Sequence, residues 1–98
     1  MAIKKQFLKS KPVCKVTFTL LASEASSVAV VGSFNEWSEE ATPLKKLKNG
    51  SFKGTLDLDS GISHEFRYLV DGKYVNETEA DAFKWSDFAG AENSVLSL

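Results

Sequence analysis

The sequence has few of the residues that stabilise disulfide-rich or metal-bound domains. Its 98 residues include one cysteine, one histidine and two prolines. A single cysteine cannot form an internal disulfide, and one cysteine with one histidine cannot supply the four ligands of a structural zinc site. We therefore expect Cys14 to be a buried thiol in a reducing compartment, and we expect neither a transition-metal site nor a cofactor.

The sequence also has no large excess of positive or negative charge and no long hydrophobic run. The 12 basic and 13 acidic residues leave a formal net charge of −1, which produces no field that would attract nucleic acid or an anionic membrane. No apolar segment approaches the roughly 20 residues of a membrane span, and the N-terminus has no apolar run typical of a signal peptide. These absences favour a cytoplasmic protein that binds neither nucleic acid nor membranes.

The segments that are present are short and alternate between apolar and polar positions. Two of them place an apolar or aromatic side chain at every second position: Cys14, Val16, Phe18 and Leu20, and His64, Phe66, Tyr68 and Val70. Asn49-Gly50 is typical of a hairpin turn, and Asp71-Gly72 is a second tight turn. Short strands separated by glycine turns, without a long helical period, predict an all-β fold, an immunoglobulin-like antiparallel β-sandwich.

The predicted domain organisation is simple. Residues 1–11 contain four lysines and are expected to be a basic, flexible lead-in, whereas residues 12–98 are expected to form one β-sandwich domain. Residues 76–89 are rich in acids and aromatics and are expected to form a long irregular loop. Three acidic residues of this loop are expected to be solvated, with a calcium site as the alternative: Glu77, Glu79 and Asp81.

One stretch, residues 32–37 (Gly-Ser-Phe-Asn-Glu-Trp), directly follows the apolar run of residues 28–31. Gly32 allows a turn without steric cost, and Asn35 tolerates left-handed backbone angles. The turn would deliver Trp37 just past a sharp corner. Two interpretations of this tryptophan remain open: a core residue that folds back under the turn, or a flat platform for a ligand.

This stretch resembles carbohydrate-binding family 48, the glycogen- and starch-binding modules of isoamylases, glycogen branching enzymes and the β-subunit of AMP-activated protein kinase. Three further stretches are similar to the same family in the same order: residues 64–72, 73–76 and 90–96. The similarity extends from about Val13 to Leu98. It implies binding of an α-glucan such as glycogen or starch. In the related enzymes a large catalytic barrel follows the module, and no barrel follows here, so we expect a protein that is not an enzyme.

The resemblance also implies site residues. Trp37 is one aromatic platform, and Tyr74 occupies the place of the family's second tryptophan, where it would stack over a smaller area. Arg67 lies where the family has a lysine that bonds sugar hydroxyls, and Asn93 aligns with a sugar-contacting asparagine. For three of these residues a structural role remains the alternative: Tyr74 as a strand residue, Arg67 as a rim charge paired with Glu65 or another acid, and Asn93 as a residue bonded to its own backbone.

Two departures from the family affect the expected site. Ala91 stands where the kinase modules carry a hydroxyl, so one polar contact would be missing. The loop after Tyr74 is longer and carries Phe83, Trp85 and Phe88. Trp85 is either a third stacking surface or, with the other two aromatics, part of a cluster that pins the loop onto the sandwich.

Three functions remain open after these observations. The first is non-catalytic binding of α-1,4-glucan. The second is a protein-interaction sandwich with an eroded sugar site that docks on a separately encoded glucan enzyme or kinase, in which case Trp37 should be partly buried and unpaired with a second platform. The third is a detached piece of a glucan enzyme that rejoins its barrel. Catalysis by this chain itself finds little support, since its acids lie in turns and loops rather than on either side of a cleft.

Overall fold

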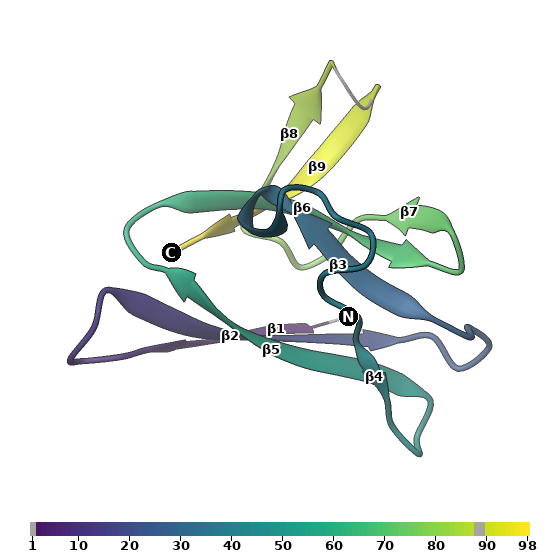
Figure 1. Ribbon diagram of the computed structural model, residues 1–98. Helices are drawn as coiled ribbons and strands as arrows, with labels where there is room; N and C mark the ends of the chain where they lie inside the picture. The colour runs from purple at the N-terminus through teal and green to yellow at the C-terminus, as the bar shows by residue number, and fades with distance from the viewer. Residues whose placement is uncertain (1, 88–89) are drawn as a thin grey trace.

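The structure, a computed structural model, describes residues 2–87 and 90–98 and contains two antiparallel sheets packed face to face (Figure 1). The first sheet has the strand order β1-β2-β5-β4, and the second has the order β3-β6-β9-β8, with β7 also paired to β6. The strands, with one 3-10 turn after β3, are β1 (Ala2–Phe7), β2 (Val13–Leu21), β3 (Val28–Gly32), η1 (Ser33–Asn35), β4 (Lys45–Lys46), β5 (Ser51–Asp59), β6 (Ser63–Val70), β7 (Lys73–Val75), β8 (Ala82–Ser86) and β9 (Ala91–Ser97). The predicted all-β, immunoglobulin-like sandwich is confirmed. In the described part of the chain, no helix is long and apolar enough to cross a membrane.

The core lies between the alternating strands β2 and β6. The ring of Phe18 on β2 meets Phe66 and Tyr68 on β6 edge-on, with ring centroids 5.3 and 6.3 Å apart. All three side chains have no exposed surface. Such edge-to-face pairs stabilise a core beyond the area that they bury. Because side chains alternate along a strand, Glu65 and Arg67, on either side of Phe66, face outward, away from the first sheet.

Strand β3 is buried on both faces, as expected from its continuous apolar run. One of its edges pairs with β6, and the other is covered by the segment that leads to β4. Val30 donates its amide to the carbonyl of Thr42, and Leu44 donates to the carbonyl of Val28. These bonds attach the loop of residues 36–43 to the sheet.

The basic N-terminus differs from its prediction as a flexible lead-in. Residues 2–7 form β1, which pairs with β2 along its whole length. The Nζ atom of Lys5 donates to the carboxylate of Asp81 at 2.6 Å and to the carbonyl of Ser97 at 3.1 Å. From this strand, Ile3 packs against the core. Residues 2–7 lack a clear alternating pattern, so the sequence did not indicate a strand; pairing with the edge of β2 and the ion pair of Lys5 hold it in place.

The segment of residues 76–89 also differs from the expected irregular loop, since it contains β8 and a buried acid, Glu77. Glu77 has no exposed surface and accepts a hydrogen bond from the hydroxyl of Tyr68 at 2.8 Å. Its amide donates to the hydroxyl of Ser94. Burial, followed by the Glu77 charge, raises the pKa of Tyr68. The prediction of three solvated acids is therefore wrong for Glu77, which links β6 to β9, and Asp81 is ion-paired.

We predict that Asp81→Asn loosens β1. Partial burial acts to raise the pKa of Asp81, but the bonds from Lys5 and Ser97 outweigh it and hold this pKa below its ordinary value. A carboxyl whose pKa is lowered by folding stabilises the protein at pH values above its unfolded-state pKa. This stabilisation is lost as the pH falls through the folded-state pKa. At neutral pH we expect a loss of less than about 1 kcal/mol, typical of exposed ion pairs.

Amide hydrogen exchange measures this effect locally. The amides of β1 should exchange faster in Asp81→Asn than in the wild type at pH 7, and the difference should shrink in acid. Asp57→Asn, the same chemical change at an exposed position of β5, is the control. Unchanged exchange along β1 in Asp81→Asn would contradict the anchoring role.

Candidate functional site

The turn after β3 is held by the side chain of Asn35, which makes three hydrogen bonds. Its Oδ1 accepts from the amide of Gly32 at 3.0 Å, and its Nδ2 donates to the carbonyl of Val30 at 2.9 Å and to the hydroxyl of Thr42 at 3.0 Å. This amide therefore ties together the end of β3, the turn and the following loop.

The left-handed residues of the turn are Glu36 and Trp37, each with φ of 58°, rather than Gly32 or Asn35. Gly32 itself is extended, and a Cβ atom there would lie 2.5 Å from the carbonyl oxygen of Glu65. The glycine is thus required by close packing against β6. A bulky residue in the left-handed region costs about 1–2 kcal/mol and persists where its surroundings fix it. The three bonds of Asn35 provide that constraint.

Phe34 and Trp37, both in this turn, differ in their contact with the core. The ring of Phe34 packs on the core, with its centroid 6.3 Å from that of Phe18 and 6.0 Å from that of His64. Trp37 is 37% exposed. Phe34 thus anchors the turn from beneath, and Trp37 keeps more than a third of its surface exposed, as a platform would require.

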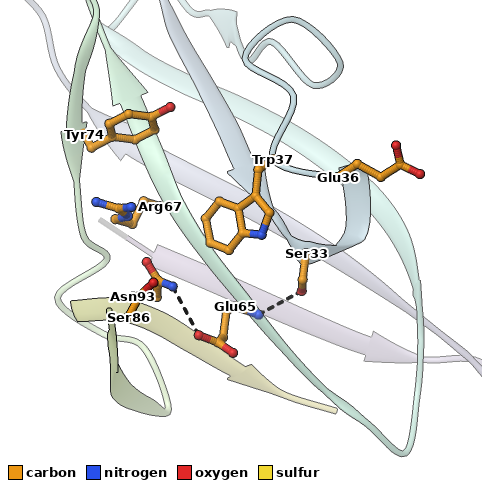
Figure 2. A pocket seen from close by; sticks show the side chains of 8 residues that line it. All are labelled: Ser33, Glu36, Trp37, Glu65, Arg67, Tyr74, Ser86 and Asn93. Atoms are coloured by element: carbon orange, nitrogen blue, oxygen red, sulfur yellow. Dashed lines mark hydrogen bonds between the residues drawn. The ribbon is translucent and has the colours of Figure 1, made fainter. Parts of the chain in front are cut away.

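Trp37 borders a pocket of about 820 Å³ on the outer face of the second sheet (Figure 2). This volume lies within the range of small-ligand sites, about 300–1,000 Å³. Strands β6, β7, β8 and β9 and the turn after β3 each contribute at least one lining side chain. The lining residues are Ser33, Glu36, Trp37, Glu65, Arg67, Tyr74, Ser86 and Asn93.

Tyr74 and Arg67 support each other in this pocket. The guanidinium carbon of Arg67 lies 4.7 Å from the centroid of the Tyr74 ring, within the range of a cation–π contact. The hydroxyl of Tyr74 donates to Oε2 of Glu39 at 2.6 Å. This bond is the main cause of the raised pKa of Tyr74. The ring is thus held at two points, and 43% of the residue remains exposed.

Two buried polar atoms in the pocket have no hydrogen-bond partner within the described residues: Nε of Arg67, a donor, and Oδ1 of Asn93, an acceptor. The other end of the Asn93 amide is occupied, since its Nδ2 donates to Oε1 of Glu65 at 3.1 Å. Leaving a buried donor or acceptor unpaired costs about 1–3 kcal/mol. A ligand that both donates and accepts hydrogen bonds would remove that cost once a small movement of the covering side chains exposes these two atoms, which have almost no accessible surface.

Comparison with known proteins agrees with this geometry. The family model described as the glycogen recognition site of AMP-activated protein kinase matches residues 15–98. The chain belongs to this family of glycogen-recognition domains. The match begins within β2, so β1 lies outside it.

Two curated relatives of this glycogen-recognition domain are branching enzymes. The chain is 33% identical over 57 residues to the 1,4-alpha-glucan branching enzyme GlgB of Photobacterium profundum, covering 57% of this chain and 8% of that protein. It is 29% identical over 75 residues to the enzyme of the same name from Nocardia farcinica, covering 74% of this chain and 10% of that protein. The chain therefore spans about a tenth or less of the length of these relatives.

The domain brings together four of the five side chains expected in the site: Trp37, Arg67, Tyr74 and Asn93. Trp85 is not with them. On β8 it precedes Ser86, which lines the pocket, so the alternation of the strand places Trp85 on the opposite face. It is 60% exposed, and its indole nitrogen donates to Asp87. Neither a role in the pocket nor burial against the sandwich agrees with this position.

Phe83 and Trp85, the two described aromatics of the expected pinning cluster, are both exposed. Phe83 is 47% exposed on the same strand, whereas Phe88 lies outside the described residues. The longer segment instead contributes to the pocket through Ser86. This serine pairs with Ala91 in the ladder between β8 and β9. A hydroxyl therefore lines the pocket beside the alanine where the contact was expected to be missing.

The sequence did not indicate all of the pocket. Glu65 could have been found, because it alternates with Arg67 on the outward face of β6. Ser86 could not, because β8 was not predicted. Glu39 lies in a polar loop, and nothing in its local sequence indicates a bond to Tyr74, 35 residues away.

We predict that Trp37→Ala and Phe34→Ala have opposite effects on stability and binding. Removing the exposed Trp37 should change the free energy of unfolding by less than about 1 kcal/mol and abolish the response to glucan. Removing the Phe34 ring, which packs against the core, should cost about 3 kcal/mol. Thermal melts and titration of β-cyclodextrin check both effects. Equal destabilisation by the two variants would mean that Trp37 is a structural residue.

Proposed function

We propose that this glycogen-recognition domain binds α-1,4-glucan without catalysis, through the pocket between Trp37 and Tyr74. The observation that carries the proposal is the combination of exposed aromatic faces with a buried unpaired donor and acceptor. Pyranose rings present flat C–H patches that stack on aromatic rings, with hydroxyls around their rim. The aromatic faces fit the patches, while Arg67 Nε and Asn93 Oδ1 fit the hydroxyls.

The arrangement favours sugar binding over an eroded site that serves only protein docking. Erosion would leave Trp37 partly buried and unpaired with a second platform. Trp37 is partly buried, since 37% of it is exposed, but it is not unpaired, because Tyr74, 43% exposed, lines the same pocket. The names of both relatives refer to 1,4-alpha-glucan, which supports the choice of linkage. We further propose a cytoplasmic location and a separately encoded glucan-active enzyme as a partner.

We expect the domain to bind maltoheptaose with modest affinity. Two stacked aromatics and a few hydroxyl contacts suggest about −4 to −7 kcal/mol, a dissociation constant between roughly 1 mM and 10 μM. Isothermal calorimetry or NMR titration measures this constant. Cellohexaose is the matched control, because its flat β-linked chain should not follow a surface shaped for a curved α-glucan. The absence of a saturable response to maltoheptaose at several millimolar would refute the proposal.

We also expect no hydrolysis or branching. Glycoside hydrolysis requires two carboxylates on either side of the scissile bond. Of the two acids that line the pocket, Glu36 points its carboxylate away from the indole of Trp37, and Glu65 is bonded to Asn93 (Figure 2). Incubation with glycogen or starch should release no reducing sugar and create no new branch points. Activity that survives purification and disappears in Glu65→Gln would overturn the non-catalytic assignment.

A further inference from the structure

The amide of Asn93 has a fixed orientation because of its neighbour on β6. Glu65 pairs with Val95 in the ladder, so Asn93, two residues before Val95, is its diagonal neighbour on the same outer face. An ionised carboxylate only accepts hydrogen bonds. The nitrogen and oxygen of an amide side chain are often hard to tell apart. Here the carboxylate decides between them, because only the NH₂ group of Asn93 can donate to it. The 3.1 Å bond from Nδ2 to Oε1 has this sense.

The Glu65 residue is held in place by three neighbours. Its backbone amide donates to the hydroxyl of Ser33 at 3.1 Å, which fixes the backbone at this position. Oε1 accepts from Asn93, and Oε2 lies 3.9 Å from the ammonium nitrogen of Lys84 on β8. The side chain is 32% exposed. It is thus positioned between the pocket and the neighbouring strand rather than free in solvent.

This orientation decides which group of Asn93 a ligand meets. With NH₂ turned to Glu65, the buried Oδ1 remains as the unpaired acceptor, and Nε of Arg67, which lines the same pocket, is an unpaired donor. The pocket then requires a ligand group that donates to Asn93 and one that accepts from Arg67. A sugar hydroxyl can do either. A reversed amide would present two donors and would favour acceptor-only groups such as ethers, carboxylates or phosphates.

We propose that Glu65 is the positioning residue that makes this pocket selective for ligands with donating hydroxyls. This inference rests on the proposed glucan binding and adds to it the residue that sets the sense of the hydrogen bond at Asn93. Its carboxylate also disfavours an anionic ligand in the same pocket through like-charge repulsion. Glu65 acts through Asn93 and does not need to contact the sugar.

The test compares β-cyclodextrin with its heptakis(2,3-di-O-methyl) derivative, which keeps acceptor oxygens but lacks donating hydroxyls at these positions. The wild type should bind the methylated ligand at least about tenfold more weakly, which corresponds to one lost hydrogen bond. In Glu65→Ala the Asn93 amide can turn. Affinity for β-cyclodextrin should fall about tenfold, and the difference between the two ligands should shrink to about threefold or less.

Glu65→Gln is the conservative variant. Its side-chain oxygen can still accept from Asn93, so affinity and selectivity should stay within about threefold of the wild type. Glu92→Ala is the charge control, since it removes one carboxylate at the position next to Asn93 on the opposite face of β9. Glu92→Ala should retain the wild-type affinity for β-cyclodextrin and the wild-type selectivity between the two ligands. The side-chain NH₂ resonances of Asn93 should move in Glu65→Ala without ligand and stay near their wild-type positions in Glu65→Gln.

The outcomes separate this inference from the proposed function. A wild type that binds neither cyclodextrin overturns both. A wild type that binds β-cyclodextrin, with Glu65→Ala of equal affinity and selectivity, overturns the role of Glu65 and leaves glucan binding in place. A Glu65→Gln variant that loses selectivity overturns this role as well. Its side-chain oxygen can still accept from Asn93, so the selectivity would not depend on that hydrogen bond. If Glu65→Ala fails to fold, the selectivity and the Asn93 resonances of Glu65→Gln decide.

Discussion

The packing of Phe18 against Phe66 and Tyr68 is the interaction on which the rest of the molecule depends. It joins the two sheets through three fully buried rings and fixes which face of β6 lies inside. Side chains alternate along a strand, so fixing Phe66 and Tyr68 inward places Glu65 and Arg67 outward. The pocket is therefore the outer side of the same contact that builds the core. A shift of β6 by one residue would exchange the two faces and remove both.

A second constraint holds β9 at the correct position beside β6. The buried carboxylate of Glu77 accepts from Tyr68, and the backbone of Glu77 donates to Ser94. The Ser94 hydroxyl in turn donates to Asn76. Strand β9 pairs with residues 63–66 of β6, and β7 pairs with residues 68–70. The network lies at the junction between these two ladders, where polar contacts replace ladder bonds. Ser94 lies between Asn93 and Val95, whose side chains face outward. By holding Ser94 on the inner side of the sheet, the network helps to fix the position of Asn93.

The pocket combines rigid support with polar groups that the fold leaves unpaired. Trp37 has an unfavourable backbone conformation that Asn35 holds by three side-chain bonds. Tyr74 is held between Arg67 and a carboxylate. Strain and unpaired buried groups cost folding free energy, and they persist where the surrounding structure determines them. Their concentration in one pocket, away from the well-paired core, is the pattern expected of a binding site.

The sequence by itself determined the class of fold, because period-two alternation and glycine turns report the two faces of a strand and where it ends. Through its family resemblance it also indicated Trp37, Arg67, Tyr74 and Asn93, which the fold brings together around one pocket. Only the tertiary structure decided that residues 2–7 form an edge strand and that Trp85 lies on the face opposite the pocket. Alternation gives the relative direction of side chains within one strand, but not the strand with which an edge pairs. For the same reason, the contact between Glu65 and Asn93, which are 28 residues apart, depends on the register of β6 against β9 and could not be read from either strand alone.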